Sequence, residues 1–194
     1  MAVRETLQIG NPLLKAHNAV VTELTDPKIK QVVADLIDTM RANELVGIAA
    51  PQIGENYRLF VTEPRETEVR PKEQSDDLRV YINPKMVFAS EEQVEIWEGC
   101  GCVANATLFA PVIRPKVVAV EATNAEGQLF RIKADGILGR VIQHEYDHLD
   151  GIEFVEKIAD LKRITSKEFY IKLIKPLPEV KQTSLITIKE VEQL

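Results

Sequence analysis

Apolar residues recur at helical spacing near the beginning of the chain. Asp26-Pro27 can cap and start a helix, because an aspartate side chain accepts backbone hydrogen bonds there and proline fits the first turn. The apolar positions that follow fall mostly three or four residues apart and are Ile29, Val32, Val33, Leu36, Ile37 and Met40. This spacing predicts an amphipathic helix whose apolar face packs on a core.

The middle of the chain alternates short apolar runs with turn residues, a pattern typical of β-strands. The predicted strands cover residues 57–62, 80–82, 86–89, 94–97, 116–123 and 129–133. The last two flank Asn124-Ala125-Glu126-Gly127, which favours a hairpin turn. Residues 45–54 and 63–78 are predicted loops, since the first is rich in small residues and the second is polar and carries two prolines.

Two further helices are predicted in the last third of the chain. One runs from about Ile137 to Leu149 and stops near Gly151, because glycine commonly follows a last helical turn. The other covers residues 159–174 and is broken by Lys175-Pro176-Leu177-Pro178. The final residues, 179–194, alternate polar and apolar side chains, which predicts either an edge strand or a mobile tail.

Length and charge favour a single soluble domain over a nucleic-acid-binding or membrane protein. A chain of 194 residues with 45% hydrophobic residues supports one domain with a substantial core. Its 24 basic and 30 acidic residues give a net charge of -6, which disfavours direct nucleic-acid binding. No stretch approaches the roughly 18 consecutive apolar residues of a membrane span, and the first ten residues lack the apolar core of a signal peptide. We therefore expect a soluble, cytoplasmic protein with no membrane partner.

The segment His144-Glu145-Tyr146-Asp147-His148 contains two of the chain's three histidines. Helical positions four residues apart differ by only about 40° around the axis, so both imidazoles can reach one ion. Glu145 lies beside them and can take a proton from a metal-activated water. The pattern indicates metal-assisted hydrolysis, and the ordinary alternative is a pair of surface histidines on a charged helix.

A hydrolytic site of this kind needs a third protein ligand and one open position. Cys100 is one candidate, because its flanking glycines let the backbone approach a metal closely. Glu168 would complete a two-histidine, one-glutamate site suited to an endopeptidase, although an exposed helical glutamate is its ordinary interpretation. Cys100 together with Cys102 would close the site and make the metal structural, but their spacing is unusually tight for ligands and for a disulfide. Spacing alone leaves these alternatives open.

Three segments resemble, in order and spacing, the three motifs of the peptide deformylase family. They are Gly47-Ile48-Ala49-Ala50-Pro51-Gln52, Glu98-Gly99-Cys100 and Gln143-His144-Glu145-Tyr146-Asp147-His148-Leu149-Asp150-Gly151. Further similarity runs from Leu7-Gln8-Ile9 through Ile82-Asn83-Pro84 to Ala134-Asp135-Gly136 and so covers nearly everything up to about residue 165. The resemblance implies Cys100 as the third ligand beside His144 and His148.

The resemblance and the predicted elements together imply an α+β fold. Mixed, mainly antiparallel sheets would pack around a central helix that carries the metal motif, with one helix near each end of the chain. A catalytic domain would cover residues 1–178, and residues 179–194 would form the tail.

The implied activity is removal of the N-formyl group from N-formylmethionyl nascent polypeptides, with release of formate. The family uses Fe2+ as its usual ion, and Zn2+, Ni2+ or Co2+ can replace it. Glu145 would be the general base, while the Gln52 side-chain amide and the Gly101 backbone N–H would stabilise the oxyanion. The implied substrate-binding residues are Val46, Gly47, Ile48, Ile96, Gly99, Ile137 and Val141. Transient docking at the ribosome stays open, as does the choice between a monomer and a weak dimer.

The chain departs from the family pattern around the expected oxyanion donor. Leu45 stands where the family usually has glycine, and Gly101-Cys102 stands where it has a hydrophobic residue and serine. Ala104 replaces a frequent proline, and residues 101–113 contain no basic side chain. These changes concern turnover and substrate affinity, so the alternative is a deformylase-like protein that binds peptide N-termini but acts slowly. Cys102 also predicts sensitivity to oxidation, because it places a second thiol near the metal.

Overall fold

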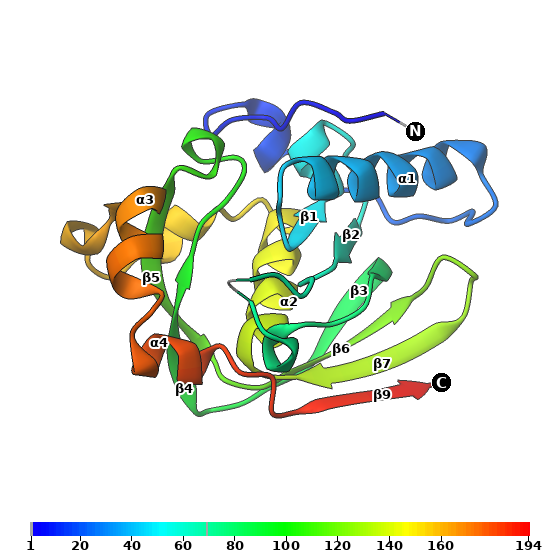
Figure 1. The fold of residues 1–194 in the computed structure, drawn as a ribbon. Helices are drawn as coiled ribbons and strands as arrows, with labels where there is room; N and C mark the ends of the chain where they lie inside the picture. The colour runs from blue at the N-terminus through cyan, green and yellow to red at the C-terminus, as the bar shows by residue number, and fades with distance from the viewer. Residues whose placement is uncertain (1, 69) are drawn as a thin grey trace.

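Antiparallel strands and a central helix form most of the structure (Figure 1). The computed structural model describes residues 2–68 and 70–194. The larger sheet has the strand order β1-β2-β3-β6-β7-β9, and the smaller sheet has the order β4-β5-β8. The strands are β1 Gly47–Ala49, β2 Leu59–Thr62, β3 Arg79–Ala89, β4 Gln93–Glu98, β5 Leu108–Pro115, β6 Val118–Thr123, β7 Leu129–Ala134, β8 Thr165–Ser166 and β9 Lys189–Gln193. The predicted α+β fold with mainly antiparallel sheets is confirmed.

The central helix, α2 (Gly136–Leu149), has an apolar side that packs on the larger sheet (Figure 1). Leu138 and Ile142 are fully buried there in one cluster with Val120 and Ile132. The other side of α2 faces the smaller sheet, where the Arg140 guanidinium donates to backbone carbonyls of β4 and β5. The predicted helix over 137–149 is therefore confirmed, and its polar residues lie between two rigid layers.

The first long helix, α1 (Pro27–Ala42), begins as the sequence indicates and covers β1 and β2. The Asp26 side chain accepts a hydrogen bond of 2.8 Å from the backbone N–H of Lys28, which caps the first turn. The buried residues of α1 and the two strands form one cluster, with Leu36, Met40, Ile48 and Leu59 fully buried. Helix α1 thus fixes β1 from the face opposite α2.

Two of the predicted strands, 80–82 and 86–89, are parts of the single strand β3. The pairing of β3 with β6 shifts register between Ile82 and Lys85. At this bulge Asn83 has a left-handed backbone, with φ of +51°, and its side-chain amide exchanges two hydrogen bonds of 2.8 Å with the backbone of Val21. The interval between the two predicted strands is therefore a bulge within one strand.

The predicted helix over 159–174 is wrong in its first half. Residues 165–166 form β8 and pair with Leu108 and Phe109 of β5. Helix α3 (Lys167–Phe169) begins only after Ser166, whose hydroxyl accepts from the Phe169 N–H, and it continues as a π-helical turn over Tyr170–Ile174. A second short helix, α4 (Pro178–Thr183), follows the predicted break.

The end of the chain lies against the start of α2. Strand β9 pairs with β7, and the Asp135 carboxylate accepts backbone N–H bonds from Thr187 and Ile188. Gly136 has a φ of +56°, and a Cβ there would lie 2.0 Å from the Leu185 carbonyl oxygen. Only glycine allows this close approach.

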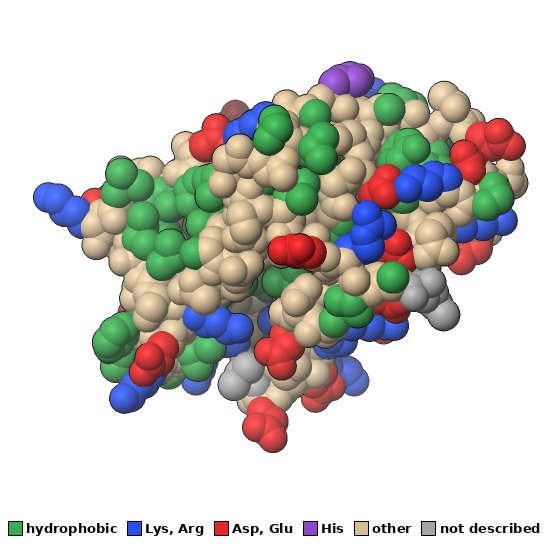
Figure 2. Space-filling model, turned by 90° about the horizontal axis from the view of Figure 1, so that it is seen from above, with side chains coloured by type: hydrophobic (Ala, Val, Ile, Leu, Met, Phe, Trp, Pro, Cys, Tyr) green, Lys and Arg blue, Asp and Glu red, His purple; other side chains and the backbone are tan. Residues whose placement is uncertain are grey.

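Apolar side chains also reach the surface near α3. The exposed large apolar residues of this region are Leu161, Ile164, Phe169, Ile171, Leu173 and Leu177. Figure 2 shows hydrophobic side chains gathered on the side of the molecule where Figure 1 places α3. None of the helices in the described residues has the length and apolar character needed to cross a membrane.

The Asp76 carboxylate, whose side chain is fully buried, connects β9 to the rest of the sheet. It accepts hydrogen bonds from Arg79 at 2.7 Å and from Lys189 of β9 at 2.9 Å. Burial opposes ionisation, but these two cations hold the pKa of Asp76 below its usual value.

Replacing Asp76 with asparagine is expected to lower the free energy of unfolding by about 2 kcal/mol at pH 7, because it removes a charge-assisted pair. A depressed pKa stabilises the fold above the unfolded-state value of about 3.9 and loses that contribution as the pH falls through the native value. Urea denaturation should therefore show a difference between wild type and Asp76→Asn that shrinks below about pH 4. A constant difference from pH 7 to pH 3 would contradict this account.

Candidate metal centre

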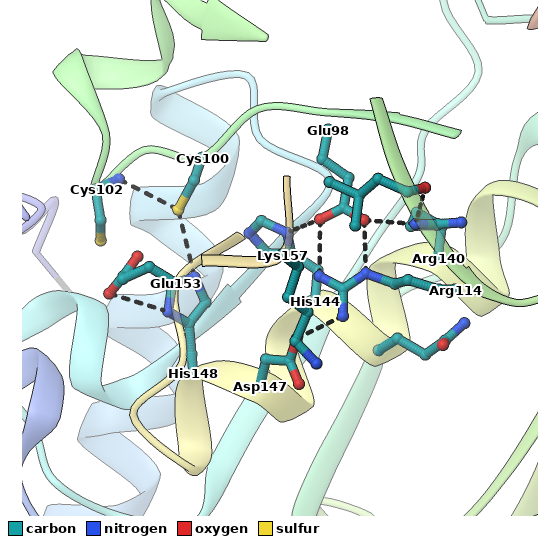
Figure 3. A network of polar contacts seen from close by, with 12 residues as sticks. Glu98, Cys100, Cys102, Arg114, Arg140, His144, Asp147, His148, Glu153 and Lys157 are labelled. Atoms are coloured by element: carbon teal, nitrogen blue, oxygen red, sulfur yellow. Dashed lines mark hydrogen bonds and ion pairs between the residues drawn. The ribbon is translucent and has the colours of Figure 1, made fainter. Parts of the chain in front are cut away.

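Helix α2 and the loop after β4 bring three possible ligands together. His144 and His148 lie on one face of α2, and Cys100 approaches from the loop (Figure 3). Their candidate ligand atoms all lie within 4.8 Å of one another, and all three side chains are buried. The Cys100 sulfur is 3.3 Å from Nε2 of His148. The arrangement is compact enough for one ion.

Two alternatives from the sequence find no support in the geometry. Glu168 is exposed on α3 and lies outside the group of converging ligand atoms. Cys102 is fully buried near Cys100 but is also outside that group. A third protein ligand is therefore available from Cys100 alone among these candidates.

Glu98 holds the ring of His144 in place. Its Oε2 lies 2.8 Å from Nδ1 of His144, while Arg114 and Arg140 donate to the same carboxylate at 2.7–2.9 Å (Figure 3). Although burial opposes ionisation, hydrogen bonds from His144 and Arg114 hold the pKa of Glu98 well below its usual range. The carboxylate can accept the Nδ1 proton, which leaves Nε2 of His144 as a lone-pair donor.

His148 has a similar but looser partner in Glu153. Nδ1 of His148 lies 3.7 Å from Oε1 of Glu153, and neither this nitrogen nor the Glu153 carboxylate has a hydrogen-bond partner among the described residues. Burial, followed by the charge of His144, lowers the pKa of His148, so its imidazole is neutral as a ligand must be. These unpartnered buried groups fit a bound cation.

The chemistry of the Cys100 thiol also fits a bound cation. A hydrogen bond with the Cys102 thiol, together with burial, raises the pKa of Cys100 well above its usual value. A buried thiol between two imidazoles becomes a thiolate when a cation is bound, because the cation supplies the opposing charge. The donor set of one sulfur and two nitrogens suits a borderline divalent transition metal.

Glu145 lies against β1 beside the possible ligands. Burial raises its pKa to about 7, and its Oε2 has no hydrogen-bond partner among the described residues. A Cβ on Gly47 would lie 2.7 Å from Oε1 of Glu145 and 2.6 Å from Cγ1 of Val141. Glycine at position 47 is therefore required for the close approach of β1 to this carboxyl group.

Gln52 and Gly101 each present a hydrogen-bond donor near the sulfurs. The Gln52 Oε1 accepts from the Ala49 N–H at 2.6 Å, which fixes the amide and leaves Nε2 at 3.5 Å from the sulfurs of Cys100 and Cys102. The backbone N–H of Gly101 donates to no acceptor in residues 2–68 and 70–194. Among the described residues the Gly101 N–H has no acceptor, whereas Gln52 Nε2 makes long hydrogen bonds to both sulfurs and would exchange one of them to bind a ligand oxygen.

The other candidate substrate residues differ in their exposure. Val46, Gly99 and Ile137 are half-buried, while Ile96 and Val141 are 3% and 5% exposed. Ile48 is fully buried in the cluster that β1 forms with α1, so only its backbone is available at the site. Gly99 is covered by the ring of Phe109, which would lie 2.7 Å from a Cβ at that position.

Glu98, Glu153, Arg114 and Arg140 were not recognised from the sequence as parts of this site. Glu98 belonged to a motif, but its contact with His144 depends on a strand that ends beside α2. Glu153 follows α2 closely, which is the one signal that could have found it.

Replacing Cys102 with serine is expected to slow oxidative loss of metal. In the wild type, hydrogen peroxide can oxidise Cys100 to a sulfenic acid, and the Cys102 thiol can then condense with it, releasing water, to a disulfide that is strained and reducible because of the tight spacing. Zinc-loaded wild type should lose free thiols and metal several-fold faster than Cys102→Ser under the same peroxide exposure. Equal rates of zinc release from both proteins would refute the role of Cys102.

Known proteins are similar to this chain over most of its length. The family model described as polypeptide deformylase matches residues 3–164. Peptide deformylase of Acinetobacter baumannii is 38% identical over 175 residues, which cover 90% of this chain and 94% of that protein. Peptide deformylase 2 of Nostoc sp. is 37% identical over 164 residues, covering 84% and 90%.

Solved structures are similar over the same region. The peptide deformylase of Ehrlichia chaffeensis in complex with actinonin has a TM-score of 0.75 at 34% identity, covering 90% of this chain and 97% of that one. The Met-Ala-Ser-bound enzyme of A. baumannii has a TM-score of 0.74 at 30% identity, covering 81% and 99%. The chain belongs to the polypeptide deformylase family.

Proposed function

We propose that this chain is a peptide deformylase, a metal-dependent hydrolase that removes the N-formyl group from N-formylmethionyl nascent polypeptides and releases formate. The observation that carries the proposal is the convergence of Cys100, His144 and His148 beside the buried carboxyl group of Glu145. Residues 1–178 would form the catalytic domain, and residues 179–194 the tail.

Cys100, His144 and His148 would hold one divalent ion, with Fe2+ as the physiological metal by family membership and Zn2+, Ni2+ or Co2+ as substitutes. Such an ion lowers the pKa of water and polarises the formyl carbonyl. Glu98 supports the site by holding the ring of His144, and Glu153 is placed to do the same for His148.

Glu145 would accept a proton from the attacking water and later deliver it to the leaving amine. Its buried position and raised pKa suit this exchange, because the group can both take and release a proton near neutral pH. When water adds to the formyl carbon, negative charge develops on the carbonyl oxygen. Gln52 Nε2 and the Gly101 N–H would donate hydrogen bonds to that oxygen.

The peptide would bind along β1. This strand forms one edge of the larger sheet, so an extended peptide can add to it through main-chain hydrogen bonds. Gly47 and Ile48 would contribute backbone groups, and Val46, Ile96, Gly99, Ile137 and Val141 would surround the methionine side chain. The bound Met-Ala-Ser in the A. baumannii structure supports a formyl-Met-Ala-Ser peptide as the test substrate.

The proposed setting is the cytoplasm, where nascent chains are available. Transient contact with the ribosome and a monomeric or weakly dimeric state belong to the same proposal.

Formate release from formyl-Met-Ala-Ser by anaerobically iron-loaded protein tests the function. Steady-state turnover well above that of the metal-free protein is expected. Binding of the peptide without turnover would instead support a deformylase-like protein that only recognises N-termini, and the atypical Gly101-Cys102 pair would then be the first place to seek the cause.

A further inference from the structure

One of the two proposed oxyanion donors is the backbone N–H of Gly101, a glycine. Glycine has wide freedom in both backbone dihedrals, so its N–H stays aimed only if other groups hold the two adjoining peptides. The peptide before Gly101, which carries this N–H, is held through the Cys100 carbonyl, which accepts from the Val103 and Ala106 N–H groups at 3.1 Å. The peptide after it ends in the Cys102 N–H, which lies 3.4 Å from the Cys100 sulfur.

The N-terminal segment crosses this loop and Gln52 together. The Leu7 N–H donates to the Gln52 carbonyl at 2.8 Å, and the Ile9 N–H donates to the Cys102 carbonyl at 2.7 Å. Between them, Nε2 of Gln8 donates to the Gly101 carbonyl at 2.9 Å. One short stretch of chain therefore contacts the backbone of both proposed oxyanion donors.

The other end of the Gln8 amide holds the next turn of the loop. Its Oε1 accepts a hydrogen bond of 3.1 Å from the Asn105 N–H. Residues 104–106 all have left-handed backbones, with φ of +47°, +52° and +58°. This conformation is costly for residues other than glycine and persists only where surrounding contacts maintain it.

Side-chain packing does not by itself hold Gly101. A Cβ at this position would lie 3.4 Å from Cδ1 of Leu45 and 3.7 Å from Cγ2 of Thr6, which are ordinary contact distances, so glycine leaves a small space here. The orientation of its carbonyl therefore depends on the hydrogen bond from Gln8.

We propose that Gln8 is a positioning residue for the oxyanion site: by binding the Gly101 carbonyl and the Asn105 N–H, it fixes the direction of the Gly101 N–H. This inference rests on the proposed function for its kinetic consequence, but the rigidity of Gly101 can be measured separately.

Gln8→Glu is the sharpest variant, because it keeps an oxygen for Asn105 and loses the donor to Gly101. The backbone hydrogen bonds of Leu7 and Ile9 remain, so the segment stays in place. The kcat for formyl-Met-Ala-Ser should fall about 10-fold, less than the roughly 100-fold or greater loss expected when an oxyanion donor is removed. KM and metal content should change less than twofold. Gln8→Ala should behave in the same way. Gln93→Glu makes an equal charge change at the exposed first residue of β4 and should leave kcat unchanged.

Nuclear magnetic resonance relaxation of the zinc-loaded protein supplies the second measurement. The amide order parameter of Gly101 should be near 0.85 in the wild type and fall below about 0.6 in Gln8→Glu. An unchanged order parameter overturns the inference, as does a twofold or smaller change in kcat in an active protein. If the wild type releases no formate, the proposed function fails and the relaxation measurement alone decides the role of Gln8.

Discussion

Glu145→Ala is expected to lower kcat/KM for formyl-Met-Ala-Ser by about 1,000-fold, within the range typical of losing a general acid–base group. Glu145 is buried, has one oxygen without a hydrogen-bond partner in the described part of the chain, and lies beside the possible ligands without belonging to their group. Metal content should therefore stay at the wild-type value. Formate release by the iron-loaded variant, with metal analysis of the same sample, measures both quantities.

Two control variants distinguish the loss of proton transfer from a change in packing. Glu145→Gln keeps the volume of the side chain and should lose as much activity as Glu145→Ala. Glu91→Ala removes an exposed carboxylate in the turn between β3 and β4 and should retain full activity. If Glu145→Gln kept a tenth of the wild-type kcat/KM, Glu145 would not be the base.

Cys100→Ala should have the largest effect on metal affinity. Loss of a residue that only orients a ligand weakens binding about 10- to 100-fold, so loss of the thiolate itself should exceed that range. Competition with a chromogenic chelator measures the affinity for zinc. In cobalt-loaded protein, the thiolate-to-cobalt charge-transfer absorption should disappear in Cys100→Ala.

Cys102→Ser and Glu168→Ala are matched tests of the alternative ligand sets. Both should bind zinc within about threefold of the wild type, since neither residue belongs to the converging group. The cobalt absorption should remain in both. A 100-fold loss of zinc affinity in Glu168→Ala would instead support a glutamate-ligated centre, and the same loss in Cys102→Ser would support a closed structural site.

The site residues that lie on one helix could be predicted from the local sequence. Two histidines four residues apart share a helical face wherever the helix lies, so His144, His148 and Glu145 could be predicted from the sequence. The choice among Cys100, Cys102 and Glu168 could not be made from spacing, because it depends on how β4 ends beside α2. The resemblance to the deformylase family identified Cys100 as the third ligand.

The errors in secondary structure have the same origin. Residues 159–166 have helix-compatible composition, but Thr165 and Ser166 pair with β5, a contact across more than fifty residues that local propensity does not encode. Strand β5 itself was missed, because Pro111 and Pro115 argue against a strand. Both prolines lie in register with β4, opposite Trp97 and Gln93, but beyond Leu108 and Phe109, the residues that pair with β8. The second edge of β5 therefore needs no backbone donor from them.

The pairing of β9 with β7 also bears on solubility. An uncovered strand edge offers its backbone groups to strands of other molecules and promotes aggregation. Here β9 covers β7, and as the new outermost strand it is short and carries Lys189, Glu190 and Glu192. Charged side chains on a short edge strand discourage further pairing, so the last residues of the chain protect the concentrated protein from self-association through this edge.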